Sequence, residues 1–138
     1  MRAVGYHCCW RARAMSEITD QLKARTMRFA LDACALIKNL PRDEPGPTVR
    51  RQLARASTGV AFNYRSSCRS RSHAEFTARI AVVAEEADES LGWLEFIATG
   101  KLIDSPELTR LMRESDELAA IFSASAATAR AKERNGRR

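Results

Sequence analysis

The chain has 138 residues and a formal net charge of +6, with 45% hydrophobic and 29% charged residues. This length predicts a single domain with its own core, and no apolar run approaches the ~20 residues of a membrane-spanning helix. The four cysteines have no C-x-x-C spacing, which argues against a disulfide framework or a zinc site and is typical of a cytoplasmic protein. Glycine and proline are scarce among many alanine, leucine, arginine and glutamate residues, which favours helix over strand.

Residues 1–14, which read MRAVGYHCCWRARA, are basic but lack both the apolar core of a secretory signal and the periodicity of a helix. We expect this segment to be a disordered extension, or to be translated from a start upstream of the natural one. The bundle domain is predicted to cover residues 15–129, followed by a disordered basic tail at residues 130–138.

Two helices are predicted in the first half of the chain. The first runs from its N-cap Ser16 to Leu40, with apolar residues recurring at three- and four-residue steps. The segment PRDEPGP cannot continue a helix and is predicted to be a loop. The second helix begins near Pro47, and Gly59 in its middle costs about 1 kcal/mol relative to alanine, which is tolerable where another backbone packs close. Its apolar face is predicted to comprise Val49, Leu53, Ala56 and Val60.

A third helix is predicted to begin after Ser72. Ser72 and Glu75 form a capping-box pattern, in which the hydroxyl and the carboxylate each satisfy a free backbone amide. Gly100 is predicted to end this helix in the left-handed conformation. The apolar seam, sustained over about three heptads, is predicted to comprise Phe76, Ile80, Val83, Ala87, Leu91 or Ser90, Leu94 and Ala98. A second stripe, which predicts that the helix is covered on two sides, comprises Val82, Glu86, Glu89, Trp93 and Phe96.

A fourth helix is predicted after the cap Ser105, with Pro106 in its first turn and Glu107 complementing the helix dipole. It should fray after about Ala129. Its predicted core face comprises Leu108, Leu111, Ser115, Leu118 and Phe122. Short connections place consecutive long helices antiparallel. The predicted fold is therefore all-α, an antiparallel up-down-up-down four-helix bundle.

Opposite charges occupy separate parts of the chain. Between Val49 and Arg79, seven arginines accompany a single acid, Glu75, whereas residues 80–99 contain five acids and no base. The C-terminal RAKERNGRR is basic again. This asymmetry predicts either a polyanionic partner or interlocking copies of the chain.

The stretch of residues 50–97 also carries a pattern of a known family. Its elements are Asn63-Tyr64-Arg65, Arg69-Ser70-Arg71, Glu75-Phe76 and an acidic run from Glu85 to Glu89. This pattern resembles the four-helix bundle proteins first noticed in intervening sequences of bacterial 23S ribosomal RNA genes, and the likeness covers residues 16 to about 127. Many relatives read Asn-Ile-Ala-Glu-Gly after the second helix, where this chain reads NYRSS at residues 63–67.

The resemblance implies a bacterial homo-oligomer, typically a pentameric barrel of bundles. The chain is also similar to the accessory proteins of diversity-generating retroelements, whose basic surface engages a reverse transcriptase and nucleic acid. Further copies of the chain, RNA or DNA, and a reverse transcriptase are therefore the expected partners.

Five arginines are candidate nucleic-acid-binding residues: Arg51, Arg55, Arg65, Arg69 and Arg71. Guanidinium groups at this density can neutralise several phosphates without reading sequence. The alternative is that they pair with acids of the third helix, within the bundle or between subunits. Pairing is favoured for the first three, and nucleic acid for the last two and the C-terminal tail. Apart from Tyr64 the block offers few aromatic side chains for stacking, so we expect weak, sequence-independent binding.

The third helix supplies the candidate oligomer-interface residues: Glu85, Glu86, Asp88, Glu89, Trp93 and Phe96. The two aromatic residues either complete the core or form a patch that another subunit covers. Neighbouring carboxylates raise one another's pKa and could serve acid–base catalysis. No nucleophile or phosphate loop accompanies them, so a solvated or arginine-paired face is favoured.

The fragment His73-Ala74-Glu75 matches the first half of a zinc deaminase signature, but no Pro-Cys-x-x-Cys follows it. The sequence also lacks the Glu-x-x-His pairs of di-iron bundles. We therefore expect no catalytic residue, metal or cofactor. The sequence predicts a non-enzymatic homo-oligomeric scaffold with weak nucleic-acid binding, and the alternative is a protein–protein assembly module without a nucleic-acid ligand.

Overall fold

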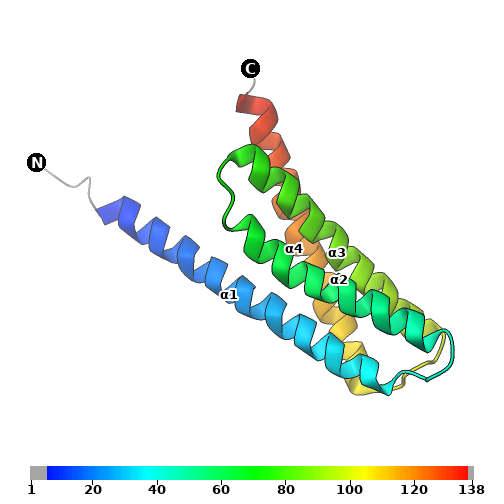
Figure 1. Cartoon of the computed structure of the whole chain (residues 1–138). Helices are drawn as coiled ribbons and strands as arrows, with labels where there is room; N and C mark the ends of the chain where they lie inside the picture. The colour runs from blue at the N-terminus through cyan, green and yellow to red at the C-terminus, as the bar shows by residue number, and fades with distance from the viewer. Residues whose placement is uncertain (1–5, 137–138) are drawn as a thin grey trace, which may run out of the picture.

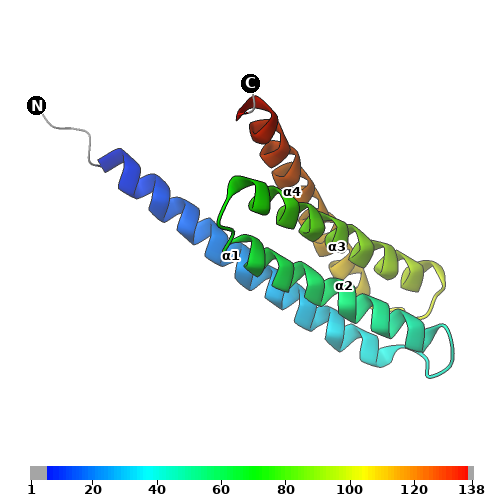
Figure 2. The ribbon, with the colours of Figure 1, turned by 45° about the horizontal axis from the view of Figure 1, so that its top comes forward.

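The computed structural model describes residues 6–136, and the side chains of residues 15–136. Its elements are α1 (Tyr6–Leu36), the short 3₁₀ helix η1 (Ile37–Asn39), α2 (Gly46–Ser67), α3 (His73–Thr99) and α4 (Pro106–Gly136). Consecutive long helices alternate in direction and lie side by side, as Figures 1 and 2 show. The described residues contain no strand. The predicted all-α four-helix bundle is confirmed.

The helix starts follow local capping chemistry. The Ser72 hydroxyl accepts a hydrogen bond from the Glu75 amide at 3.1 Å, and the Glu75 carboxylate accepts one from the Arg71 amide at 2.8 Å. The Ser105 hydroxyl accepts a hydrogen bond from the Leu108 amide at 3.3 Å. Each bond satisfies an amide that the first helical turn leaves without a partner. The predicted starts of α3 and α4 are confirmed.

The end of α3 differs from the prediction. Gly100 has ordinary right-handed dihedral angles, with φ of −75°. The residue with positive φ is Lys101, at 53°. The turn still closes by hydrogen bonds from the Gly100 amide to the Phe96 carbonyl and from the Lys101 amide to the Ala98 carbonyl. The left-handed backbone conformation therefore falls on Lys101, one residue after the predicted Gly100.

The outer bounds of the bundle also differ from the prediction. Helix α1 begins at Tyr6, so Ser16 lies within the helix and is not its cap. The helix therefore includes residues 6–14, which were expected to be disordered. Its first turns extend beyond the other helices in Figures 1 and 2. Helix α4 continues to Gly136, past the predicted fraying point at Ala129. Residues 1–5 and 137–138 lie outside the described part of the chain, and the proposed division into extension, domain and tail stays a prediction.

The core runs along the bundle axis and contains the predicted faces of α2 and α4 in full. In α3, Ser90 and Ile97 are buried, whereas Leu91 is only partly buried. Ser90 can be buried because its hydroxyl donates a hydrogen bond to the Glu86 carbonyl of its own helix at 2.8 Å. The Ser115 hydroxyl of α4 bonds the Ala87 carbonyl of α3 at 3.3 Å, which joins the two helices inside the core.

Ion pairs connect α1 to α4. The Arg25 guanidinium lies 2.6 Å from a carboxylate oxygen of both Glu114 and Glu117, and Asp32 accepts a hydrogen bond from Arg110 at 2.7 Å.

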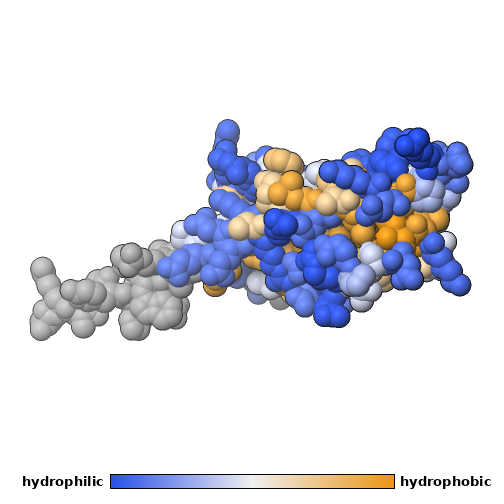
Figure 3. All heavy atoms as spheres, turned by 90° about the horizontal axis from the view of Figure 1, so that it is seen from below, coloured by the Kyte–Doolittle hydropathy of each residue, from blue (hydrophilic) through white to orange (hydrophobic). Residues whose placement is uncertain are grey.

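Figure 3 shows the molecule from below the view of Figure 1, where α1 and the first turns of α4 lie lowest. On that face, hydrophobic patches interrupt a mainly hydrophilic surface. None of the described helices combines the length and apolar character that crossing a bilayer requires.

Candidate nucleic-acid interface

Three arginines of the basic block are engaged within the chain. Arg50 donates hydrogen bonds to the carbonyls of Ile37 and Leu40, at 3.3 and 3.2 Å, at the end of the first helical segment. Arg79 pairs with Glu75 at 2.8 Å and donates a hydrogen bond to the Ser66 hydroxyl. These guanidinium groups connect elements of the bundle. Part of their hydrogen-bonding capacity is therefore already occupied within the chain.

Arg55 is the third engaged arginine. It pairs with Glu86 and Glu89 of α3, and its guanidinium lies 3.5 Å from Glu86. The pairing interpretation therefore describes Arg55 in the isolated chain.

Four arginines of the same block remain available. Arg51 is exposed and donates a hydrogen bond to the Thr48 hydroxyl at 3.3 Å. The side chains of Arg65, Arg69 and Arg71 are exposed, and none of them has an ion-pair partner among residues 15–136. The pairing expected for Arg51 and Arg65 is therefore not found within one chain. Their pairing between subunits stays a prediction.

The last turns of α4 lie at the same end of the bundle. His73, at the start of α3, forms a hydrogen bond through Nε2 with the Ala129 carbonyl of α4 at 2.9 Å. Both the α2–α3 connection and the end of α4 lie in the upper part of Figure 1. Their exposed basic side chains form one group, which we call the basic end: Arg65, Arg69, Arg71, Arg130, Lys132 and Arg134. Glu133 is an acid among them and is itself engaged in an interaction.

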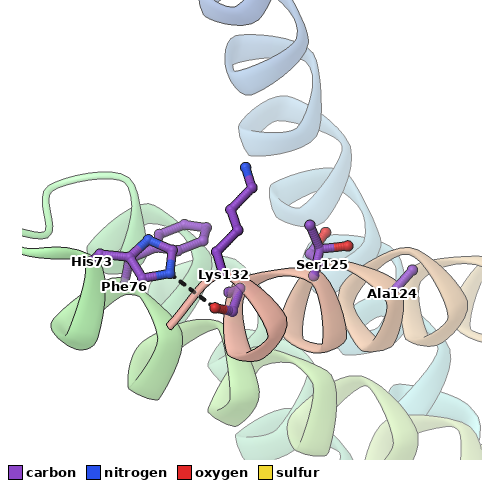
Figure 4. A pocket seen from close by; sticks show the side chains of 7 residues that line it. His73, Phe76, Ala124, Ser125 and Lys132 are labelled. Atoms are coloured by element: carbon purple, nitrogen blue, oxygen red, sulfur yellow. Dashed lines mark hydrogen bonds between the residues drawn. The ribbon is translucent and has the colours of Figure 1, made fainter. Parts of the chain in front are cut away.

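Two cavities open at the basic end. The first, of about 430 Å³, lies between the start of α3 and the end of α4, and Figure 4 shows His73, Phe76, Ser125 and Lys132 around it. The second, of about 350 Å³, lies between α1 and the α2–α3 connection. Phe76 and Ser125 line both cavities. We expected Phe76 only in the core seam, and Lys132 only as part of the basic C-terminal tail. The available signal was the run SASAATARAK at residues 123–132, whose small side chains leave room opposite Phe76.

Tyr64 cannot serve as a stacking platform in this structure. It is only 6% exposed, and its ring lies 5.1 Å from that of Phe122 in the core. Burial, together with the neighbouring Cys68, raises the pKa of its hydroxyl. The aromatic residue that the sequence offered for base contacts is therefore a core residue.

The four acidic residues predicted at the oligomer interface divide into two pairs. Glu85 and Asp88 are exposed and line a shallow hollow with Arg130 of α4. Glu86 and Glu89 form ion pairs with the Arg55 guanidinium. Burial raises the pKa of Glu86, with a further increase from Glu89 and Glu85, and the attraction of Arg55 opposes this shift.

Glu86 also explains the glycine of α2. A methyl group added at Gly59 would lie 3.0 Å from the Glu86 carboxyl group. The close neighbour at Gly59 is thus a side chain, not the backbone that the sequence led us to expect.

Trp93 and Phe96 occupy the border between core and surface. Their ring centroids lie 5.7 Å apart in an edge-to-face arrangement, and the Trp93 indole donates a hydrogen bond to Glu89 at 3.3 Å. Trp93 packs partly against the core, whereas Phe96 is 46% exposed. Val82 and Phe62 are also exposed apolar side chains of α3 and α2. The predicted second stripe of α3 is therefore only partly covered within one chain.

The residues of the deaminase-like fragment have structural partners. His73 binds the α4 backbone, and Glu75 caps α3 and pairs with Arg79. The hydrogen bond from the Arg71 amide, together with the hydrogen bond and the attraction of Arg79, lowers the pKa of Glu75. The capping interpretation accounts for Glu75.

Comparison with known proteins agrees with this fold. The model of the family described as 23S rRNA-intervening sequence protein matches residues 19–124. A crystal structure of a protein of unknown function from the S23 ribosomal protein family of Bacteroides thetaiotaomicron is similar, with a TM-score of 0.69 at 22% sequence identity. The match covers 76% of this chain and 97% of that chain, and at this identity it shows the fold alone. No curated protein matches the chain.

Proposed function

The chain belongs to the family of 23S rRNA-intervening sequence proteins, and we propose that it is a non-enzymatic, homo-oligomeric scaffold whose basic end binds nucleic acid without sequence preference. The observation that carries this proposal is the contrast among the arginines of one block. Arg50, Arg55 and Arg79 are engaged within the bundle, whereas Arg65, Arg69 and Arg71 are exposed without ion-pair partners in the described chain.

Exposed guanidinium groups favour phosphate as the ligand because they present planar, permanently charged donors that match phosphate oxygens. The basic end combines three such groups with Arg130, Lys132 and Arg134 of α4. Charge contacts of this kind do not distinguish bases. The proposed binding is therefore sequence-independent and sensitive to salt.

The double variant Arg69→Ala/Arg71→Ala tests this function. We expect it to weaken binding to a mixed-sequence RNA at low salt and to reduce the slope of log affinity against log salt by about 2, because two phosphate contacts are lost. The matched control is Arg42→Ala/Arg113→Ala, which removes two exposed arginines away from the basic end. Equal losses in both double variants would contradict a localised site, since they would reflect net charge alone.

A second candidate function is a protein–protein assembly module without a nucleic-acid ligand. The partly exposed Trp93 and Phe96, beside the acidic side chains of α3, favour it. The same double variant separates the two functions. If the wild-type protein does not bind RNA and the double variant loses assembly, the assembly module is favoured. Loss of RNA binding with assembly intact would favour the scaffold. A pentameric state, a cytoplasmic location and a reverse transcriptase partner stay predictions from the sequence.

A further inference from the structure

The cavity between α3 and α4 has the composition of a site for a flat, partly apolar group. Phe76 supplies an aromatic surface, and the α4 side contributes small residues such as Ser125 and Ala129. A volume of about 430 Å³ is within the roughly 300–1,000 Å³ range of small-molecule pockets. A planar ring could therefore enter beside Phe76.

Open space on two sides distinguishes Phe76 from the other aromatic residues of the bundle interior. It lines the α3–α4 cavity and also the cavity beside the α2–α3 connection. Tyr64 and Phe122, by contrast, line only the second cavity, and Phe29 lines neither. Stacking on an aromatic ring tolerates every base, because each base has a π-face. This is the kind of contact that a sequence-independent binder can use.

Hydrogen-bonding groups surround the ring without specifying one base. The His73 ring is oriented by its bond to the Ala129 carbonyl, and its other nitrogen is not used in that bond. Ser125 and Thr128 also line the cavity, and the Ser125 hydroxyl donates a hydrogen bond to the Ile121 carbonyl of its own helix at 2.9 Å, which leaves its oxygen as an acceptor. A threonine hydroxyl both donates and accepts, so this pair of side chains can meet different base edges.

The charges at the rim fit phosphates on both sides of an inserted base. Figure 4 shows the Lys132 side chain extending away from α4 beside the cavity. Ser70 and Ser72 line the second cavity, and they flank Arg71 directly in sequence. Lys132 therefore lines the space on the α4 side of Phe76, and Arg71 is adjacent in sequence to the residues that line it on the α2–α3 side.

We propose that the basic end binds single-stranded nucleic acid by accepting one unpaired base in the cavity beside Phe76, with the adjoining phosphates at Lys132 and at the arginines of the α2–α3 connection. This inference rests on the proposed function and specifies its ligand. A base inside a duplex is stacked and paired, and reaching the cavity would require its extrusion. The site therefore favours an unpaired strand, RNA or DNA, over a duplex of the same sequence.

The test compares Phe76→Leu with Phe29→Leu, which removes an aromatic ring from the bundle interior outside both cavities. The probes are a short mixed-sequence oligonucleotide as single-stranded RNA, as single-stranded DNA and as a DNA duplex. Phe76→Leu should weaken single-strand binding about tenfold, as expected for one lost stacking contact, and leave duplex binding unchanged. Phe29→Leu should bind as wild type does. A difference between the RNA and DNA strands would show which of the two sources of an unpaired base is preferred.

A crosslinking measurement on the wild-type protein avoids any effect of the substitution on folding. A single-stranded oligonucleotide containing 5-iodouracil, irradiated in the complex, should crosslink to the peptide that carries Phe76. Crosslinks found only elsewhere would overturn the base site. If Phe76→Leu binds single strands normally while Arg69→Ala/Arg71→Ala does not, the base site is wrong and the proposed function stands. If wild-type protein binds neither single strands nor duplex, both are wrong.

Discussion

Among the single residues, the Glu86 carboxylate is destabilised by burial, and the attraction of Arg55 offsets only part of this cost. Burial raises the pKa of its carboxyl group, and Arg55 approaches it at the long distance of 3.5 Å. Since the folded-state pKa lies above the unfolded one, the folded chain binds more protons in the pH range between these two values. Stability should therefore fall as the pH rises through that range and stay lower at neutral pH.

Glu86→Gln should accordingly stabilise the chain at neutral pH, because the amide keeps the shape of the side chain and removes its buried charge. Denaturant unfolding should show a higher midpoint than wild type at pH 7, and the two midpoints should converge at a pH below the ordinary value of 4.5. The control Glu95→Gln removes an exposed carboxylate of the same helix. A lower midpoint for Glu86→Gln at pH 7 would show that the attraction of Arg55 outweighs the cost of burial.

At the scale of elements, α1 is fastened to α4 by polar contacts that respond to pH in the opposite direction. Burial tends to raise the pKa of Asp32, but hydrogen bonds from Arg110 and Arg28 outweigh it and lower that pKa. The stabilisation from Asp32 is therefore present above its unfolded pKa and is lost as the pH falls through the folded one. Acid should loosen the contact between α1 and α4.

Asp32→Asn should destabilise the chain by about 1–2 kcal/mol at neutral pH, because charge-assisted hydrogen bonds become neutral ones. Hydrogen exchange should increase in α1 more than in α2 or α3. The difference from wild type should vanish at a pH below the folded-state pKa of Asp32. Asp116→Asn, an exposed change on α4, is the control. Uniformly faster exchange in all four helices would contradict an effect localised at α1.

Local sequence chemistry predicted the element boundaries inside the bundle but not those outside it. Ser72 and Ser105 form their caps with residues three positions away, so the sequence alone contains both partners. The start of α1 was not predicted, because residues 6–14 belong to the helix although their sequence lacks helical periodicity. The left-handed turn falls on Lys101 instead of Gly100, because glycine permits that conformation without requiring it.

The candidate site was harder to predict because it depends on contacts between helices. Whether an arginine is engaged is decided by the register of α2 against α3, which places Arg55 beside Glu89 and Arg79 beside Ser66. Adjacent helical positions differ by about 100°, so periodicity alone did not separate Ser90 from Leu91 in the core. The cavity at Phe76 required the end of α4 to approach the start of α3, for which the sequence has no local signal.

At the scale of the whole molecule, charge and apolar surface are separated. The basic end gathers exposed cations from α2, α4 and the α2–α3 connection, whereas Trp93, Phe96 and the paired acids lie further along α3. This separation would let one surface assemble copies of the chain while the other meets a polyanion. Assembly would also increase the number of basic ends on one particle, and with it the strength of weak individual contacts.

Binding of wild-type protein to mixed RNA and to duplex DNA across a salt series, with the mass of the assembly recorded in the same samples, tests whether the basic end meets phosphates. We expect a steep loss of affinity as salt increases while the mass stays constant, because the exposed arginines are free to meet phosphates. Absence of binding at low salt, with the assembly intact, would contradict this expectation. The arginines would then be engaged between subunits, and the chain would act as an assembly module.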